Sequence, residues 1–131
     1  MKYLTTLFAL LFSSAFAAQV ATISPKEAAQ LVAEGKAVLV DVRELSECAE
    51  TGVAAPAVLL PKSDFDGSQK LWKEFLGKNP DKQLILYCRS GRRSGAVAAA
   101  LAAQGHPVAN AGGFKDWEAA GLPVRKVEPA K

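Results

Sequence analysis

Residues 84–104 constrain the fold more than any other stretch of the chain. An apolar run, Leu84-Ile85-Leu86, leads into Tyr87-Cys88-Arg89-Ser90-Gly91-Arg92-Arg93-Ser94, and an alanine-rich stretch runs from Gly95 to Gln104. This order predicts a buried strand, a short turn and a helix whose small side chains let it lie close against a sheet. Backbone N–H groups in such a turn point inward, and the helix N-terminus adds partial positive charge. The segment therefore predicts an anion-binding loop.

Cys88 begins this loop, and we interpret it as a nucleophile. Free cysteine titrates near about 8.5, whereas cysteines at helix N-termini or beside arginine fall to roughly 3.5–7.5. Three arginines lie within five positions of the thiol. The plainer alternative is that Cys88 is an inert, buried strand end and that the arginines only solvate the loop. The candidate anion-binding residues are Arg89, Ser90, Gly91, Arg92 and Arg93.

The remainder of the chain alternates short strand and helix patterns. Strands are expected at residues 20–23, 37–40, 57–60, 84–87 and 107–109, and helices at 24–35, 71–76 (ended by Gly77), 94–104 and 114–120. Helices of about ten residues between strands imply crossovers, and hence a mostly parallel sheet. We predict a small, doubly wound α/β fold flanked by helices. Ligands of such sheets bind beyond the carboxyl ends of the strands, where Asp41 and Cys88 both fall.

The N-terminal residues predict an export signal. Lys2 supplies a short positive region, and Ala15-Phe16-Ala17 places small residues before a cut. The apolar stretch 4–12 is shorter than the roughly 20 residues that span a membrane. We expect residues 1–17 to be removed by cleavage between Ala17 and Ala18, giving a periplasmic or secreted protein without a stable membrane anchor. An uncleaved anchor is the alternative.

Residues 18–131 form one predicted domain, with its core at about 24–127. No repeat of the cysteine loop and no low-complexity linker divides it. The formal net charge is only +3, and Lys2 is the only charged residue of the predicted signal. So small a charge does not favour nucleic acid as a partner. We expect a monomer.

The second cysteine, Cys48, has three possible roles. Two cysteines in an oxidising compartment would ordinarily form a disulfide, which would disable the nucleophile. We favour a buried apolar role in a short helix, with a resolving partner of Cys88 and a permanent disulfide as alternatives. The only histidine, His106, is expected in a plain turn, so no Cys–His pair activates the thiol. No metal is expected, because no cluster has ligand spacing.

Three motifs together resemble those of single-domain rhodaneses. They are Asp41-Val42-Arg43-Glu44, the cysteine loop, and Gly112-Gly113-Phe114-Lys115-Asp116-Trp117 followed by Ala120-Gly121-Leu122-Pro123-Val124. The motifs stand in the family's order and cover most of the predicted domain. The resemblance, for an exported form of this family, implies a sulfurtransferase.

That resemblance implies roles for individual residues. Cys88 would take sulfane sulfur from a small anionic donor such as thiosulfate, become a persulfide, and pass the sulfur to a thiol or to cyanide. No cofactor would be needed beyond this covalent persulfide. Residues 88–93 would form a six-residue cradle, supported by Asp41, Arg43 and Ser94, with Gly112 and Gly113 in a turn packed beside it.

The chain also departs from the resembled pattern, and two other classes remain. The segment Thr51-Gly52-Val53-Ala54-Ala55-Pro56-Ala57 lacks the histidine of the Gly-His-Ile-Pro-Gly-Ala-like stretch common in the family, and Cys48 stands where an aromatic is common. A phosphatase or arsenate reductase needs an arginine six positions after the cysteine, where this chain has Ser94. A non-enzymatic or thiol-redox binding module of the cell envelope would use Cys48 and Cys88, although an inactive domain has no need for the intact cysteine loop.

Overall fold

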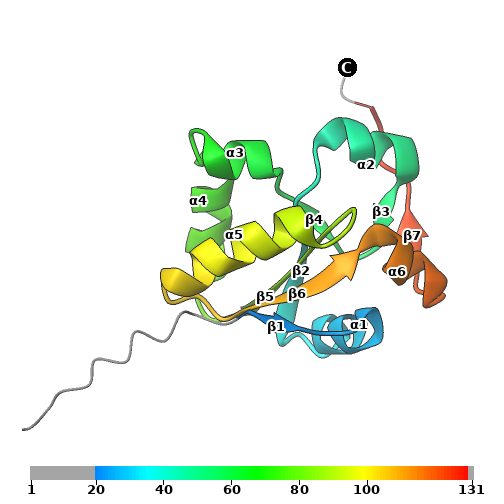
Figure 1. The fold of residues 1–131 in the computed structure, drawn as a ribbon, viewed down its shortest axis with the longest axis horizontal. Coiled ribbons are helices and arrows are strands. Elements are labelled where there is room, and N and C mark those ends of the chain that lie inside the picture. The colour runs from blue at the N-terminus through cyan, green and yellow to red at the C-terminus, as the bar shows by residue number, and fades with distance from the viewer. Residues whose placement is uncertain (1–19, 130–131) are drawn as a thin grey trace, which may run out of the picture.

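A five-stranded sheet with the order β1-β6-β5-β2-β4 forms the centre of the structure, a computed structural model that describes residues 20–129 (Figure 1). All four pairings within this sheet are parallel. The strands are β1 (Ala21–Thr22), β2 (Ala37–Asp41), β4 (Val58–Leu59), β5 (Gln83–Cys88) and β6 (Val108–Gly113). The predicted α/β class with a mostly parallel sheet is confirmed. The predicted signal peptide and its cleavage site lie outside the described residues.

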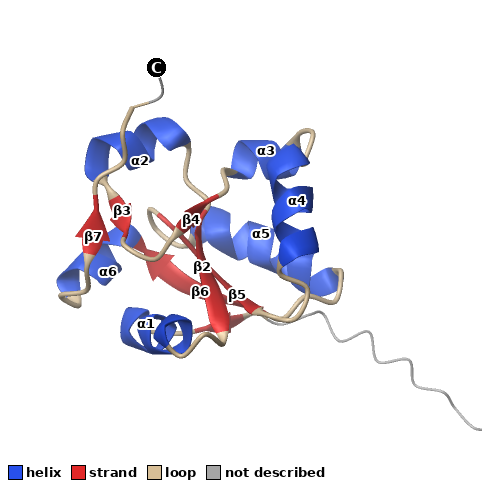
Figure 2. Ribbon diagram, turned by 180° about the vertical axis from the view of Figure 1, so that it is seen from behind, coloured by secondary structure: helices blue, strands red, loops and turns tan. Residues whose placement is uncertain are grey.

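Helices cover both faces of the sheet, as a doubly wound fold requires (Figure 2). α1 (Pro25–Ala33) and α6 (Phe114–Ala119) lie on one face; α3 (Lys62–Asp66), α4 (Lys70–Lys78) and α5 (Arg92–Ala103) lie on the other. Successive residues of β5 alternate between the two cores: Ile85 and Tyr87 pack with α1 and α6, while Leu86 and Cys88 pack with α4 and α5. This period-2 alternation places the Cys88 side chain on the α5 face.

A second, two-stranded sheet lies beyond the carboxyl end of the main one. It pairs β3 (Val53–Ala54) antiparallel with β7 (Val124–Arg125), and α2 (Leu45–Thr51) precedes it in the chain (Figure 1). The N–H of Ala54 donates to the Tyr87 hydroxyl at 3.0 Å, which fastens β3 to the central strand. The segment 51–57, whose sequence departs from the resembled pattern, thus contains the end of α2, the buried strand β3 and a turn in which Pro56 is exposed.

Two sequence signals give the element boundaries that they predicted. Ser24 caps α1, because its hydroxyl accepts the Glu27 N–H at 3.1 Å, and Pro25 occupies the first turn, where its missing N–H costs nothing.

On the other face of the sheet Trp72 is fully buried, and its ring packs edge-on against Phe65 and Phe75. Burying a large apolar side chain of this kind contributes roughly 1.5–3 kcal/mol.

Several predicted boundaries are wrong. Gly77 does not end its helix: α4 runs to Lys78, and Asn79 ends it by donating from its side chain to the Phe75 carbonyl at 2.9 Å. α5 begins at Arg92 and not at Ser94, because Gly91 takes a left-handed conformation (φ 94°) that starts the helix earlier. β6 continues to Gly113, since pairing with β5 outweighs the poor strand propensity of its small residues. Helix α3 and the β3–β7 pair were not predicted.

No helix within residues 20–129 is long and apolar enough to cross a bilayer.

Candidate active site

Cys88 is the last residue of β5, and the loop that follows folds back over its sulfur. The Gly91 N–H donates to Sγ at 3.0 Å, and the Ser94 hydroxyl lies 3.4 Å from the same atom. Gly91 can turn the chain back because glycine adopts a positive φ without steric cost. Ser90 fixes the turn from outside, where its hydroxyl accepts the Arg92 N–H at 3.4 Å. The Cys88 side chain is fully buried by this arrangement.

The environment of Cys88 favours the thiolate. Burial raises the pKa of this thiol, but hydrogen bonds from the Ser94 hydroxyl and from the backbone N–H groups of Ser94, Ser90 and Gly91 outweigh burial, so the pKa lies below the ordinary value. Donors that point at a sulfur before it ionises stabilise the anion without reorganisation. The loop therefore favours the thiolate of Cys88 without a histidine. His106 lies at the opposite end of α5, in the turn before β6.

Asn110 on the neighbouring strand β6 forms hydrogen bonds to the loop that follows Cys88. Its Nδ2 donates to the Gly91 carbonyl at 2.9 Å, and its Oδ1 accepts the Ser94 hydroxyl at 2.8 Å and the Gly112 N–H at 3.1 Å. The sequence reasoning missed Asn110. The available signal was a lone amide between Ala109 and Ala111, directly after the strand predicted at 107–109 and two residues before the Gly112-Gly113 pair.

Gly112 and Gly113 lie against the active loop, the segment 88–91 that joins β5 to α5, as the resembled motif implied. A Cβ on Gly113 would stand 2.3 Å from the Arg89 carbonyl oxygen, a distance that no side chain tolerates. A Cβ on Gly91 would stand 3.2 Å from the Cα of Gly112. The two segments can therefore approach this closely only because both carry glycine.

The three arginines of the predicted cradle have different environments. Arg92 and Arg93 belong to the first turn of α5 and not to the loop, and Arg89 is exposed. Arg93 forms a two-point ion pair with Glu47 of α2, at 2.6 and 2.8 Å. In the part of the chain that the structure describes, Arg89 and Arg92 form no ion pair. The sequence reasoning missed Glu47, since no local signal links residues so distant in the chain.

Asp41 and Arg43 form a buried pair at the carboxyl end of β2. Arg43 donates from Nε and Nη2 to the Asp41 carboxylate at 2.8–3.1 Å. Its Nη2 also donates to the Gly52 carbonyl at 2.9 Å, and its Nη1 donates to the Thr51 hydroxyl at 2.8 Å. Its guanidinium also lies 4.6 Å from the Phe114 ring centre, within cation–π distance. Each of the three guanidinium nitrogens of Arg43 therefore donates to a protein acceptor. The pair ties β2, α2 and α6 together.

Cys48 is fully buried on α2, and both cysteines are free thiols. Burial, followed by the charge of nearby Asp41, raises the pKa of the Cys48 thiol to about 12. A thiol in this state neither attacks a disulfide nor leaves one readily at neutral pH. Cys48 is therefore a buried, protonated thiol beside the Asp41–Arg43 pair.

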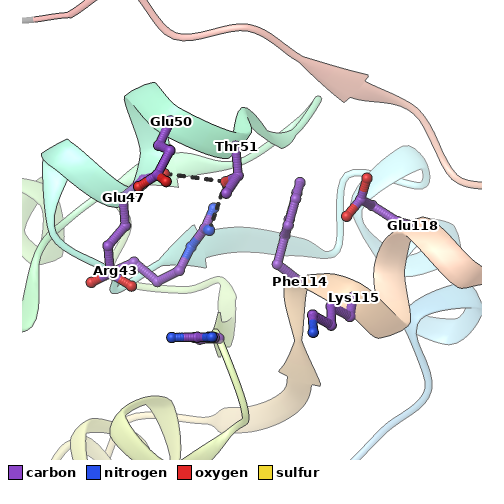
Figure 3. Close-up of a pocket in the computed structure, with 8 residues that line it drawn as sticks. Arg43, Glu47, Glu50, Thr51, Phe114, Lys115 and Glu118 are labelled. Atoms are coloured by element: carbon purple, nitrogen blue, oxygen red, sulfur yellow. Dashed lines mark hydrogen bonds between the residues drawn. The ribbon is translucent and has the colours of Figure 1, made fainter.

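A cavity of about 260 Å³ opens between α2 and α6, next to the active loop (Figure 3). Arg89 lines it from the loop, Glu50 and Thr51 from α2, and Phe114 and Lys115 from α6. Across residues 20–129, no group of three or more histidine, cysteine or acidic side chains is arranged to hold a metal ion.

Comparison with known proteins places this geometry in a family. The model of the rhodanese-like domain matches residues 24–120. A curated relative, an uncharacterized protein of Synechocystis, is 35% identical over 111 residues. The match covers 83% of this chain but 58% of that protein, so the chain spans little more than half the relative's length.

Solved structures show the same fold. The human single-domain sulfurtransferase superposes with a TM-score of 0.60 at 26% identity, covering 77% of this chain and 97% of its own. A protein of Rhodopseudomonas palustris is described as of unknown function and a possible tyrosine phosphatase. It superposes with a TM-score of 0.68 at 26% identity, and the match covers 81% of this chain and 85% of that protein.

Proposed function

The chain belongs to the rhodanese-like domain family, and from that membership we propose that it is a sulfurtransferase that carries sulfane sulfur on Cys88. The observation that carries the proposal is the sulfur-centred loop: the Gly91 N–H at 3.0 Å and the Ser94 hydroxyl at 3.4 Å both address Sγ. These donors lower the pKa of Cys88, and the thiolate is the form of cysteine that attacks sulfur. Family membership supports sulfur transfer broadly; the persulfide and its substrates are our proposal.

The proposed first half-reaction takes sulfur from a small anionic donor such as thiosulfate. The Cys88 thiolate attacks the outer sulfur, a new S–S bond forms, and the sulfur–sulfur bond of thiosulfate breaks with its electron pair on the departing sulfite. In the second half-reaction an acceptor nucleophile attacks the outer sulfur of the persulfide, and the electron pair of the broken bond returns to Sγ. No redox cofactor or metal enters this scheme, because the sulfane sulfur moves without net electron loss from the enzyme.

The size of the loop favours sulfur over phosphate. A phosphatase loop places an arginine six residues after its cysteine, whereas here Ser94 stands at that position and Arg93 pairs with Glu47. The Ser94 hydroxyl lies 3.4 Å from Sγ and donates to Asn110 Oδ1, so a neutral side chain stands where a phosphatase has its oxyanion-binding arginine. We therefore prefer sulfur transfer to the phosphatase chemistry suggested for the Rhodopseudomonas protein. A redox pair is disfavoured by the burial and raised pKa of Cys48.

Three further points belong to the proposal. We propose that the protein acts as a monomer, needs no cofactor beyond the persulfide, and works in the periplasm or outside the cell after cleavage at Ala17–Ala18. Sequencing the N-terminus of protein recovered from the cell envelope tests the export; a chain that keeps residues 1–17 in a membrane fraction would contradict it.

Intact-mass analysis after incubation with thiosulfate tests the central step. We expect a gain of one sulfur atom, reversed by cyanide, in the wild type and no gain in Cys88→Ser. A matched Cys48→Ser protein should gain the same sulfur as the wild type. A mass gain that persists in Cys88→Ser, or none in the wild type, would refute the persulfide on Cys88.

A further inference from the structure

The cavity between α2 and α6 carries charges that the protein itself does not use. Two of its charged side chains are neutralised internally: Arg43 by Asp41, and Glu47 by Arg93. Four others that line the same cavity form no ion pair within residues 20–129: Glu50, Arg89, Lys115 and Glu118. Figure 3 shows Glu50 on α2 at one side, and Lys115 and Glu118 on α6 at the other. Two positive and two negative groups therefore remain available to a ligand.

This balance of charge discriminates between ligands. A small dianion such as thiosulfate is attracted by Arg89 and Lys115 but repelled by Glu50 and Glu118, so the four groups together favour it less than Arg89 alone would. A ligand that carries both an ammonium and a carboxylate can meet charges of both signs. Phe114, which is only 5% exposed, adds a small apolar contact between the charged groups of the lining. The volume, about 260 Å³, lies just below the range of roughly 300–1,000 Å³ for small-molecule sites. It suits an amino acid or a very short peptide.

We infer that this cavity is the acceptor subsite and that it takes a low-molecular-weight thiol bearing both an ammonium and a carboxylate group, an inference that rests on the sulfurtransferase function proposed above. Arg89, the residue after Cys88, lines the cavity, so a thiol held there is close to the loop that carries the sulfur. Glu50 and Glu118 select the ammonium, and Lys115 with Arg89 selects the carboxylate.

The step is a simple sulfur transfer. The acceptor thiolate attacks the outer sulfur of the Cys88 persulfide, and a new bond forms between the acceptor sulfur and that atom. The bond between Sγ and the outer sulfur breaks, and its electron pair stays on Sγ as the thiolate. The outer sulfur takes a proton from water after loading and keeps it during the transfer, so the products are the acceptor persulfide and the Cys88 thiolate.

The test measures this second step alone. Cys88 is loaded with thiosulfate or, if thiosulfate does not load it, with inorganic polysulfide, and loss of the added sulfur is followed by intact mass. Four acceptors differ mainly in charge: cysteine, cysteamine with the ammonium only, 3-mercaptopropionate with the carboxylate only, and 2-mercaptoethanol with neither. Each variant is compared with the wild type for the same thiol, so the intrinsic reactivity of that thiol cancels. Asp81→Asn, an exposed carboxylate that does not line the cavity, is the matched control.

The two glutamate variants and the lysine variant should have opposite effects on transfer to cysteamine and to 3-mercaptopropionate. Glu50→Gln and Glu118→Gln should each slow transfer to cysteine and to cysteamine by about threefold, leave 2-mercaptoethanol unchanged and speed 3-mercaptopropionate, since exposed charge pairs contribute roughly 0.2–1 kcal/mol. Lys115→Gln should slow cysteine and 3-mercaptopropionate and speed cysteamine. High salt should reduce all of these effects. Asp81→Asn should leave every rate unchanged.

The outcomes separate the two proposals. If sulfur is transferred but the rate ratios in all three cavity variants equal those of Asp81→Asn, the acceptor subsite is wrong and the sulfurtransferase function stands. If polysulfide loads Cys88 and the charge pattern appears although thiosulfate does not load it, the subsite stands and thiosulfate is not the donor. If no thiol removes the sulfur from a loaded, folded protein, both the subsite and transfer to thiols are refuted.

Discussion

The carboxylate of Glu47 and the guanidinium of Arg93, 46 positions apart in the chain, form a two-point ion pair with N–O distances of 2.6 and 2.8 Å. The pair joins α2 to the first turn of α5, directly beside the active loop. Hydrogen bonding from Arg93 is the largest influence on Glu47, and it lowers the pKa of this carboxylate from 4.5 to about 2. An arginine that the sequence presented as a donor-binding cation is thus already occupied within the protein.

The first prediction concerns the stability of this pair at different pH values. Because the pKa of Glu47 is lower in the folded protein, the stabilisation is complete above about pH 4.5 and is lost as pH falls toward about 2. Glu47→Gln should be less stable than the wild type by about 1 kcal/mol at pH 7, since both side chains are one-third exposed. Urea unfolding should show this difference shrinking below pH 4.5. A difference that is constant down to the lowest pH at which both proteins fold would contradict the ion pair.

The second prediction separates the roles of the arginines. Arg93→Ala should lower the free energy of unfolding, because it leaves Glu47 without its partner. Arg89→Ala should leave stability unchanged and raise the KM for thiosulfate severalfold, with less effect on kcat, because uniform binding of the anion is lost. The Arg89→Ala effect should diminish at high salt, where exposed charges are screened over about 10 Å or less. Chemical unfolding measures the stability of both variants, and steady-state kinetics at two salt concentrations measure their KM for thiosulfate. Equal increases in KM in Arg89→Ala and Arg93→Ala would contradict the separate roles of the two arginines.

The third prediction concerns the two cysteines. Cys88→Ala should abolish sulfur transfer, and Cys48→Ala should keep most of it while losing roughly 1 kcal/mol of stability from its fully buried site. Covalent transfer through Cys88 should also give ping-pong kinetics. A Cys48→Ala protein that is folded but inactive would revive the redox-pair reading, and thermal unfolding of both variants provides the check.

The strand–loop–helix order around Cys88 could be predicted because each part is a local signal: an apolar run, a glycine with small neighbours, and an alanine-rich helix. The cap at Ser24 and the strand ending at Asp41 were predicted for the same reason. The start of α5 at Arg92 was not, because it depends on Gly91 taking a left-handed conformation. That choice is fixed by contacts with Asn110 and Gly112 on another strand.

The misses in the site share this physical cause. Glu47 meets Arg93, and Asn110 meets Ser94, only after β2, β5 and β6 have paired. Helix α3 is a single short turn, and β3 and β7 have two residues each, too few to produce a periodic pattern. The sequence thus indicated the strand, loop and helix around Cys88, whereas the contacts from Glu47 and Asn110 come from residues distant in the chain.

The fourth prediction concerns the hydroxyl of Ser94, which has one proton and two acceptors, Asn110 Oδ1 at 2.8 Å and Cys88 Sγ at 3.4 Å. Ser94→Ala should raise the pKa of Cys88, because it removes the hydroxyl whose hydrogen bond lowers that pKa. Asn110→Asp should raise it too, since a carboxylate repels the thiolate and holds the Ser94 proton. The alkylation rate of Cys88 as a function of pH should therefore reach its plateau at higher pH in both variants. An unchanged profile in Ser94→Ala would show that the backbone N–H groups alone set the pKa.

The fifth prediction tests whether close backbone approach builds the loop. Gly113 has an ordinary extended backbone (φ −110°), so alanine is excluded there by space alone: its Cβ would lie 2.3 Å from the Arg89 carbonyl oxygen, a backbone atom that cannot rotate away. Gly113→Ala should cost roughly 1–3 kcal/mol, as overpacking does, and should lower sulfur transfer by more than tenfold because the loop must shift at Arg89. Gly77→Ala is the matched control, since nothing lies within 4 Å of its Cβ and it sits inside α4. That change should leave transfer unchanged and stabilise the protein by roughly 0.5–1 kcal/mol. Urea unfolding and persulfide formation measured on both variants decide the matter: a Gly113→Ala protein as stable and active as the wild type would mean that the loop can yield at Arg89 without disturbing Cys88.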